Sequence, residues 1–459
     1  MRTIFIFLTI CGTLAAAGGQ TNSFPPQLLS FSAAKAQQVE SLSRDLNVPV
    51  PAPVTALFKA AQAGDYAEVS NRMAVLIPEY EEACKFDAPP DWAPFWQPMT
   101  EVESAYAAFA AGGAKYPLAL GRDIIASIPA GSIYFGGTDA GRMLVTALCV
   151  SQAEGKPFFT LTQNALSNGD YEDYVRRMYG SRIVLPGTNE VQTALDDYKT
   201  DLLRRWEHDH DFPTAPRQLK PGEDFVKKNG RVEISGQVSV MAVHDRLAKF
   251  ILDQNPKQDF YLEESYPLES LYPCESPHRL ILKVNHQPWA ALPVADLDAD
   301  HAFWTKQFGA LLGNWLTPDT SISNVCAFAR AVCGQKNGVR FRGDRQFVTN
   351  QFATGAYSKL RLSIAGLYDW RMTTYKVGTD DKARLKAEAD YAFRQAYAMC
   401  PTSAEALYRL VSFLLTQNRF GDALLVAQTT QKLAPDNPEF QSLVTSLAEY
   451  EMQNRRPAH

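Results

Sequence analysis

Two residue types recur at a fixed interval near the C-terminal end of this 459-residue chain, and that interval constrains the fold more than any other feature. Ala389 is followed 34 positions later by Ala423, and Pro401 is followed at the same distance by Pro435. A small residue lets two helices approach closely, and a proline closes a helical unit because it cannot donate the helical hydrogen bond. The interval therefore predicts repeated helix–turn–helix units that stack on one another.

The first of these units carries the pattern A-x3-F-x2-A-x4-P over residues 389–401, which includes Phe393 and Ala396. This pattern resembles the second helix of a tetratricopeptide (TPR) repeat. The resemblance implies a partner helix over residues 356–372, a capping helix after Pro435, and burial of Phe393 and Ala396 against the next unit. Two units and a cap either complete the fold of the chain or form a groove that binds another protein.

The first residues have the layout of a secretory signal peptide. Arg2 supplies a positive charge, Ile4–Leu14 is almost wholly apolar, and Ala15–Ala17 offers a cleavage site. The apolar run is shorter than the roughly 20 residues that span a membrane. We therefore expect cleavage after Ala17 and export to the periplasm or the medium.

The amino-acid composition and net charge indicate a globular protein and argue against nucleic acid as a partner. Hydrophobic residues make up 46% of the chain and charged residues 21%, which are typical values for a globular protein. The formal net charge is −5, whereas nucleic-acid-binding domains usually carry a basic surface. We therefore expect a globular protein that does not bind nucleic acid.

Six cysteines would remain after cleavage of the signal peptide. Only Cys326 and Cys333, in the stretch NVCAFARAVCGQ, invite pairing. On one continuous helix, positions seven apart lie about 10 Å from each other by helix rise, which is too far for a disulfide. These two could pair only if the helix breaks. The six are Cys84, Cys149, Cys274, Cys326, Cys333 and Cys400.

Strand-like and helix-like segments alternate between the helical ends of the chain. This alternation predicts an α/β domain with a parallel or mixed sheet, flanked by α-helical TPR-like segments. The expected segments are a signal peptide over 1–17, a helical region with a TPR-like hairpin over 18–111, the α/β domain over 112–310, a connector over 311–355 and TPR-like repeats over 356–459.

The stretch SIYFGGTDAGRMLV is the first candidate ligand site. A β-type run meets glycines, and an apolar helix-like run follows. Free N–H groups at a helix start favour an anion, and an arginine could add a bidentate contact. Alternatively, the glycines only allow a tight turn and the threonine and aspartate stabilise the helix start. The candidate ligand-binding residues are Gly136, Gly137, Thr138, Asp139 and Arg142.

The middle region also resembles a known family. The stretches IPAGSIYFGGTDAGRMLVTALC and DFYLEESYPLESLYPCESPHRLILKV are similar to the soluble C-terminal region of bacterial membrane glycosyltransferases of the protein O-mannosyltransferase-like type. This chain lacks the apolar segments of their transmembrane part, where the family's catalysis is expected. The resemblance therefore implies an accessory fold without its enzyme.

The run WEHDHDF offers a second candidate site. In an extended segment, His208 and His210 would point to the same side and could bind a metal ion. A charged helix end that runs into the loop at Pro213 explains the same residues.

Together these features predict an exported, non-catalytic scaffold without a cofactor, which binds another envelope or secreted protein through its TPR-like helices. The alternative is a carbohydrate-related binding or accessory domain that holds a glycan at the loop Gly136–Arg142.

Overall fold

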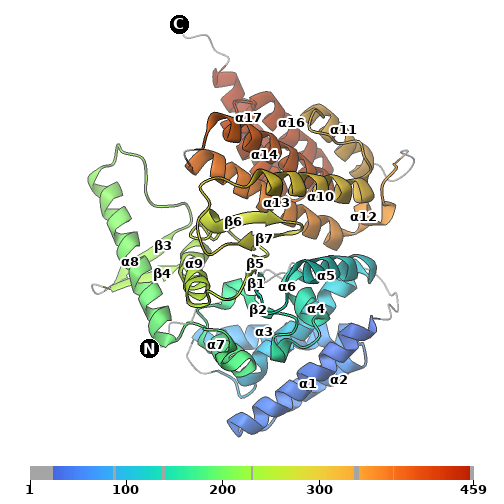
Figure 1. The fold of residues 1–459 in the computed structure, drawn as a ribbon, viewed down its shortest axis with the longest axis vertical. Coiled ribbons are helices and arrows are strands. Elements are labelled where there is room, and N and C mark those ends of the chain that lie inside the picture. The colour runs from blue at the N-terminus through green and yellow to red at the C-terminus, as the bar shows by residue number, and fades with distance from the viewer. Residues whose placement is uncertain are drawn as a thin grey trace. The chain divides into compact units, whose positions relative to one another are not determined.

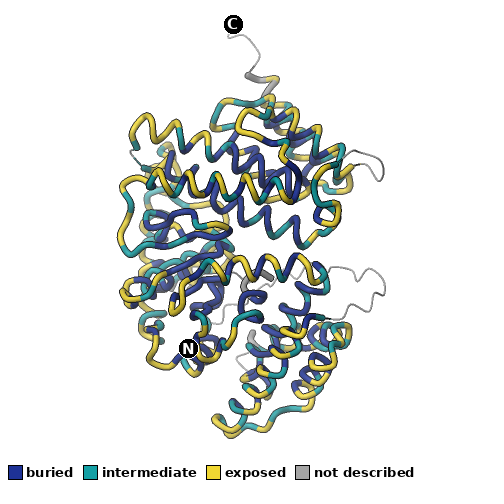
Figure 2. Tube along the Cα trace, turned by 45° about the vertical axis from the view of Figure 1, so that its right-hand side comes forward, coloured by how far each residue is buried: buried dark blue, intermediate teal, exposed yellow. Residues whose placement is uncertain are grey.

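The computed structural model describes residues 24–85, 89–136, 140–228, 231–334, 341–375 and 377–454 (Figure 1). These residues divide into two compact units. Unit 1 holds the described residues up to Cys274, together with Val284–Gln287, and unit 2 holds Glu275–Lys283 and the described residues from Pro288 onward. In both units the buried residues lie where helices and strands pack together (Figure 2).

Unit 1 begins with helices whose starts are set by proline. The first two helices each have a proline in the first turn, where its missing N–H group costs nothing. The hairpin expected in this region is present, and it turns at Gly64, whose φ of 72° suits a residue without a Cβ. These helices are α1 (Pro26–Leu46), α2 (Ala52–Gln62), α3 (Tyr66–Lys85), α4 (Trp96–Gly112) and α5 (Lys115–Ser127).

Three short parallel strands form the centre of unit 1. In the register, Ile133 pairs with Phe159 on one side and with Phe260 on the other. All residues of these strands are buried, as expected for parallel strands covered on both faces. The strands are β1 (Ile133–Gly136), β2 (Phe159–Thr162) and β5 (Phe260–Leu262), and the helices that accompany them are α6 (Ala140–Leu148), α7 (Gly169–Tyr179) and α9 (Gln237–Gln254).

Two further strands complete a five-stranded sheet in the order β2-β1-β5-β7-β6. Strands β6 (Glu275–His278) and β7 (Ile281–Val284) are joined by two residues and therefore form an antiparallel hairpin. Arg279, the first of the two, has a φ of 55°. The predicted fold class, an α/β arrangement with a parallel or mixed sheet and helical flanks, is confirmed.

A helix and a separate hairpin lie between the second and third parallel strands of unit 1. Helix α8 (Thr188–Asp211) is followed by β3 (Asp224–Lys228) and β4 (Arg231–Ser235), which pair antiparallel. The ring of Trp206 on α8 contacts Phe225 on β3 edge to face, with 6.2 Å between the ring centroids. The sequence analysis did not predict the β3–β4 hairpin.

Unit 2 is helical apart from the β6–β7 residues it contains. Side-chain caps begin several of its helices, because Ser321, Asn350 and Ser403 each accept a hydrogen bond from a backbone N–H three residues later. The helices are α10 (Val294–Leu312), α11 (Ile322–Cys333), α12 (Arg345–Thr349), α13 (Gln351–Thr374), α14 (Thr379–Met399), α15 (Ala404–Thr416), α16 (Phe420–Leu433) and α17 (Pro438–Asn454).

The segment boundaries expected at residues 111 and 310 stay a prediction, and the two units group the elements by their packing. Helices α1 and α4 both pack against α6, so the N-terminal helices belong to the same unit as the parallel strands. Helix α10 packs against α14, so the residues around it belong with the repeats. Buried contacts between distant segments set the boundaries of the two units, and they are not visible as breaks in composition.

Short 3₁₀ turns connect several elements: η1 (Ala93–Phe95), η2 (Gln152–Glu154), η3 (Gln163–Ala165), η4 (Gly180–Arg182) and η5 (Tyr272–Cys274). Among the described residues, no helix combines the length and the apolar character needed to cross a membrane.

Candidate functional site

The repeat-packing residues lie inside the stack formed by α13 to α17 in unit 2. Ala389, Ala396 and Ala423 are fully buried, and Phe393 is 2% exposed. Pro401 is also buried and follows the end of α14, whereas Pro435 lies exposed in the turn after α16. The small residues therefore lie where neighbouring helices approach closely, and the prolines stand at the ends of the helical units.

Polar groups tie neighbouring helices of the stack together. The hydroxyl of Ser358 on α13 donates a hydrogen bond to the carbonyl of Ala396 on α14, at 2.8 Å. Thr430 on α16 donates to the carbonyl of Pro401 at 2.9 Å, and its hydroxyl lies 3.0 Å from that of Tyr397. Thr430 occupies the position where the TPR pattern has alanine, and its hydroxyl is satisfied by these contacts.

One side of the stack is covered by the helices that precede it in unit 2. Helix α11 packs on α14 and α16, where Arg330 donates to Thr429 at 3.0 Å. Helix α10 packs on α14, where the hydroxyls of Thr305 and Tyr391 lie 3.2 Å apart. Arg394 on α14 also donates to backbone carbonyls of the α10–α11 connection. These contacts leave the opposite side, formed by α13, α15 and α17, as the candidate binding face.

We call this side the α15 face and define it by Asp369, Glu405, Tyr408, Arg409 and Glu439. Tyr408 is 39% exposed, and Glu405, three positions earlier on the same helix, is also exposed. Glu405 accepts a hydrogen bond from Arg409 at 3.4 Å. Burial raises the pKa of Asp369, and the nearby charge of Arg409 opposes that rise. The face therefore combines an exposed aromatic ring with three acidic groups and one basic group.

Gly366 explains how Arg409 reaches across this face. A Cβ built at Gly366 on α13 would lie 2.7 Å from the Nη2 atom of Arg409 on α15. Such a distance is too short for a real contact, so a larger residue at position 366 would displace the guanidinium. The glycine thus leaves room for the guanidinium of Arg409 beside α13.

A shallow hollow of about 670 Å³ runs along α10, on the covered side of the stack. His301 and Lys306 are among its lining residues, and His301 contacts Glu388 of α14 at 3.0 Å. This hollow lies on α10, which covers the other side of the stack, and is not part of the α15 face.

The predicted ligand loop begins where the sequence indicated, at the carboxyl end of β1. Gly136 ends that strand and pairs with Thr162 of β2. Gly137, Thr138 and Asp139 lie outside the described residues. Helix α6 begins at Ala140, so Arg142 stands in its first turn, but its side chain is not among those described. Ligand binding by this loop stays a prediction.

Polar side chains gather at the carboxyl ends of the two neighbouring parallel strands, and the sequence analysis missed most of them. Glu263 follows β5 and accepts a hydrogen bond from Tyr134 of β1. Gln163 follows β2 and accepts from the backbone N–H of Ser265 at 3.0 Å. Within the described part of the chain, Nε2 of Gln163 and Oγ1 of Thr162 are buried without a hydrogen-bond partner. Such groups are rare in folded proteins and mark this edge of the sheet as a place where a polar ligand could bind.

A serine–histidine pair lies beside this edge. Oγ of Ser167 is 2.7 Å from Nε2 of His244 on α9, and the two residues are far apart in the sequence. The histidine is fully buried, and this burial lowers its pKa to about 3. A group with so low a pKa is a weak proton acceptor near neutral pH. The pair therefore holds α9 to the turn after β2 and is a poor arrangement for activating the serine.

The two histidines of the WEHDHDF run lie in the last turn of α8, which ends at Asp211. Positions two apart on a helix point about 200° from each other, so His208 and His210 do not share a side. The extended conformation on which the metal interpretation depended is wrong, and the helix-end interpretation is correct. Within the described ranges, no group of three or more His, Cys, Asp or Glu side chains is arranged to hold a metal ion.

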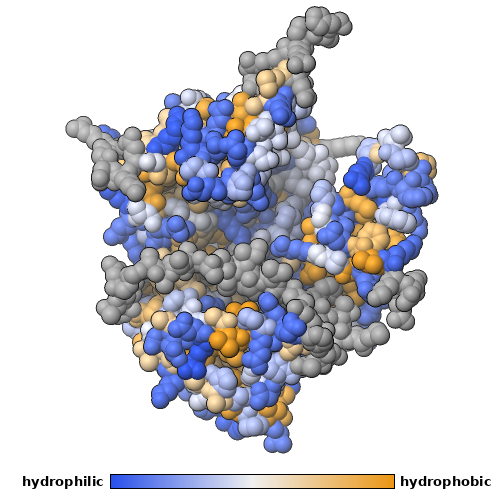
Figure 3. Space-filling view, turned by 180° about the vertical axis from the view of Figure 1, so that it is seen from behind, coloured by the Kyte–Doolittle hydropathy of each residue, from blue (hydrophilic) through white to orange (hydrophobic). Residues whose placement is uncertain are grey.

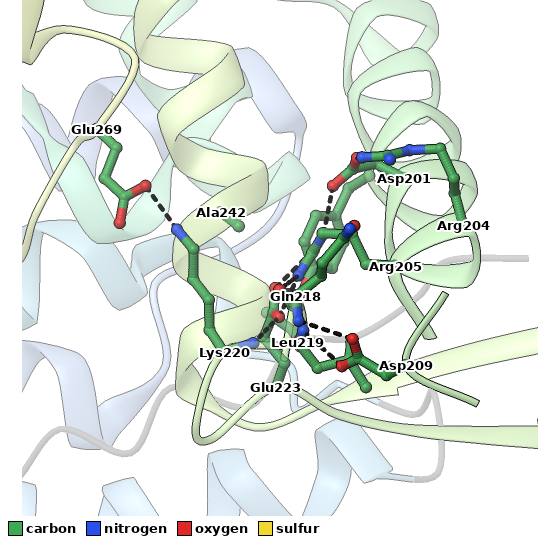
Figure 4. A network of polar contacts seen from close by, with 12 residues as sticks. Asp201, Arg204, Arg205, Asp209, Gln218, Leu219, Lys220, Glu223, Ala242 and Glu269 are labelled. Carbon is green, nitrogen blue, oxygen red and sulfur yellow. Dashed lines mark hydrogen bonds and ion pairs between the residues drawn. The ribbon is translucent and has the colours of Figure 1, made fainter. Parts of the chain in front are cut away.

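Asp209, between the two histidines, fixes the loop after α8. Its carboxylate accepts the backbone N–H groups of Gln218 at 2.8 Å and Leu219 at 3.0 Å, as Figure 4 shows. These hydrogen bonds lower the pKa of Asp209. In the same network, Arg205 donates to Asp201 and to Glu223, each at 2.8 Å. Asp209 and Arg205 therefore attach the loop that leads to β3 to helix α8.

The fold and the packing of unit 2 define a helical repeat stack joined in sequence to an α/β unit. A family model described as Tetratricopeptide repeat matches residues 387–447, which cover most of α14, all of α15 and α16, and part of α17. The chain therefore carries TPR-type repeats, and such repeats generally mediate contacts between proteins. Comparisons with curated proteins and with solved structures found no match.

Proposed function

We propose that this protein is an exported, non-catalytic scaffold that binds another envelope or secreted protein through the α15 face. The observation that carries the proposal is the arrangement of unit 2, in which α10 and α11 cover one side of a TPR-type stack and Tyr408 and Glu405 stand exposed on the other. Aromatic residues are frequent among the few side chains that dominate binding energy at protein interfaces. Tyr408 is therefore the expected anchor of the contact.

The α15 face carries charged and aromatic side chains together. On the described residues of the face that Figure 3 shows, hydrophilic and hydrophobic side chains are interspersed. The α15 face has the same mixed character, and partial burial together with the nearby carboxylate of Glu439 raises the pKa of Tyr408. Charged and polar groups at an interface contribute specificity more than affinity. A mixed surface of this kind therefore suits a partner that binds reversibly.

Capture from envelope and secreted fractions tests the scaffold proposal. The full chain, Tyr408→Ala and the matched control Lys306→Ala would each be used as bait, and the proteins retained would be quantified. We expect one or more proteins to be lost tenfold or more with Tyr408→Ala and kept with Lys306→Ala. Equal retention by all three baits would contradict the proposal.

Export is tested separately. The mature protein would be isolated from cells that express the full chain, and its first residues would be sequenced. Cleavage after Ala17 places Gly18 at the start of the mature protein. A protein that retains Met1 and remains with the cytoplasmic fraction would overturn the export part of the proposal.

A second candidate function is favoured by the polar edge of unit 1. The buried, unpartnered Nε2 of Gln163 and Oγ1 of Thr162 could donate to and accept from the hydroxyls of a sugar next to Gly136. Thermal melting with neutral monosaccharides, glucose and mannose among them, tests this. A sugar-specific rise in Tm that disappears in Gln163→Leu would support a glycan-binding role, and equal melting with and without every sugar would refute it.

A further inference from the structure

Two cysteines lie at the carboxyl ends of two helices of unit 2. Cys333 is the last residue of α11, and Cys400 follows the last residue of α14. Cys333 is exposed and Cys400 is partly exposed, so a small oxidant can reach this end of the helices. Helices α11 and α14 pack against each other, which brings their ends into the same region.

Contacts to α16 show that these two helix ends converge. A Cβ built at Gly334, directly after Cys333, would lie 3.2 Å from a methyl carbon of Leu433 on α16. One turn earlier on α16, Thr430 donates to the carbonyl of Pro401, directly after Cys400. The C-terminal part of α16 therefore touches the neighbours of both cysteines.

The two thiols are also close enough to interact electrostatically. Cys333 reaches the surface, but the protein packed around it desolvates its thiol and raises the pKa to about 11, and the nearby thiol of Cys400 contributes to that rise. Cys326 is a worse partner for Cys333, because both lie on the unbroken α11, seven positions and about 10 Å apart. Cys326 is also fully buried. The only pair that the sequence suggested is therefore not the pair that the structure favours.

We propose that Cys333 and Cys400 are a redox-active pair that forms an intramolecular disulfide by exchange with a small organic disulfide. The more exposed Cys333 thiolate attacks one sulfur of the organic disulfide, forms a mixed disulfide and releases one thiolate. The Cys400 thiolate then attacks the sulfur of Cys333 and releases the second thiolate. The two cysteines are oxidised by two electrons in total, the organic disulfide is reduced to two thiols, and the two protons lost by the cysteines are taken up by the released thiolates.

The bond would link α11 to the repeat stack. It closes a loop of roughly 70 residues, and cross-links across loops of this length restrict the unfolded chain strongly. Oxidation should therefore raise the Tm of unit 2, and a reductant should reverse the rise. This proposal does not depend on export or on partner binding, so it can fail while the proposed function holds.

Peptide mapping tests the proposal on the full chain. The reduced protein would be incubated with oxidised glutathione at pH 8.5, blocked with an alkylating agent and digested with trypsin without reduction. We expect a linked pair of the peptides AVCGQK, residues 331–336, and QAYAMCPTSAEALYR, residues 395–409. The link should persist in Cys326→Ser and disappear in Cys333→Ser and in Cys400→Ser.

Thermal melting of the reduced variants shows whether they are folded. The peptide map of the wild-type protein tests the disulfide without relying on any variant. Recovery of the linked pair in at least half of the wild-type protein, with a reversible rise in Tm, would support the proposal. Glutathione that remains on Cys333, or a link between Cys326 and Cys333, would overturn it.

Discussion

The rings of Phe393 on α14 and Phe413 on α15 lie 5.1 Å apart between centroids, inclined by 38°, and both side chains are buried. This contact joins two consecutive TPR-type repeats, because α14 belongs to the first repeat and α15 to the second. It is the point at which the predicted stacking of the repeats depends most on a single pair of side chains.

Phe393→Ala should therefore destabilise unit 2 by about 3–5 kcal/mol, the usual cost of emptying a core aromatic site. Thermal melting and limited proteolysis over residues 380–450 would measure the loss. Ala396→Trp should also destabilise, because it overfills the same fully buried region. Tyr408→Ala is the matched control on the exposed side. If both core variants melt and resist protease like the wild type, the stacking of the two repeats does not depend on this packing.

A buried ion pair in unit 1 allows a second test. Nζ of Lys35 on α1 lies 2.5 Å from Oε2 of Glu101 on α4, and the hydroxyl of Tyr174 on α7 donates to the same oxygen at 3.0 Å. Lys35→Met would leave a buried carboxylate without its cation and should cost about 3–5 kcal/mol. The double variant Lys35→Met/Glu101→Leu should be more stable than Lys35→Met, since it removes the uncompensated charge. Denaturant unfolding of the three proteins gives the comparison, and a double variant that is no more stable than the single one would count against a buried pair.

Glu172 on α7 should make the protein less stable as the pH rises. Burial raises the pKa of this carboxyl to about 7, although Arg176 at 3.1 Å opposes the shift. The folded state thus holds a proton that the unfolded state releases above its ordinary pKa near 4.5. The stabilising contribution is complete below pH 4.5 and is lost as the pH rises to 7, by up to about 3 kcal/mol. Glu172→Gln should therefore raise the Tm at pH 8 relative to wild type and change it little at pH 5. An equal shift at both values would show that this carboxyl is ionised throughout.

His244 should make the protein less stable as the pH falls. Its pKa is lowered to about 3 by burial, whereas the unfolded chain has the ordinary value near 6.5. The unfolded state therefore binds the extra proton between these values, and stability is lost as the pH falls from 6.5 towards 3. In His244→Gln, whose amide can still bond to Ser167, the Tm should fall less between pH 6.5 and 4.5 than in wild type. Parallel profiles would mean that the imidazole is protonated in the folded protein.

The features that the sequence predicted are those with a local periodic signal. The helices around Phe393 and Ala423, the hairpin that turns at Gly64 and the strand that ends at Gly136 follow from spacing and turn residues alone. Helix α8 also had such a signal, because Ala194, Leu195, Tyr198 and Leu202 are its buried residues at helical spacing. Only its charged C-terminal end, around His208 and His210, was predicted as helical.

The relationships that the sequence did not predict join residues far apart in the chain. Ser167 meets His244, Tyr134 meets Glu263, and the helix end at Cys333 lies beside the one at Cys400, each through tertiary packing. The β3–β4 hairpin was missed for another reason. Its strands DFVKK and RVEIS have only five residues each, and although RVEIS alternates polar with apolar residues, DFVKK does not, so the pair gives a weak strand signal.

Site-specific photo-crosslinking in cells tests most directly the claim that the α15 face binds a protein partner. A photoreactive phenylalanine analogue would replace Tyr408, and in a matched experiment Lys306 beside the α10 hollow. Crosslinked products would be separated and identified by mass spectrometry. The account predicts a discrete crosslinked partner, an envelope or secreted protein, from position 408 that is absent from position 306. Crosslinks from position 306 with none from position 408 would contradict it.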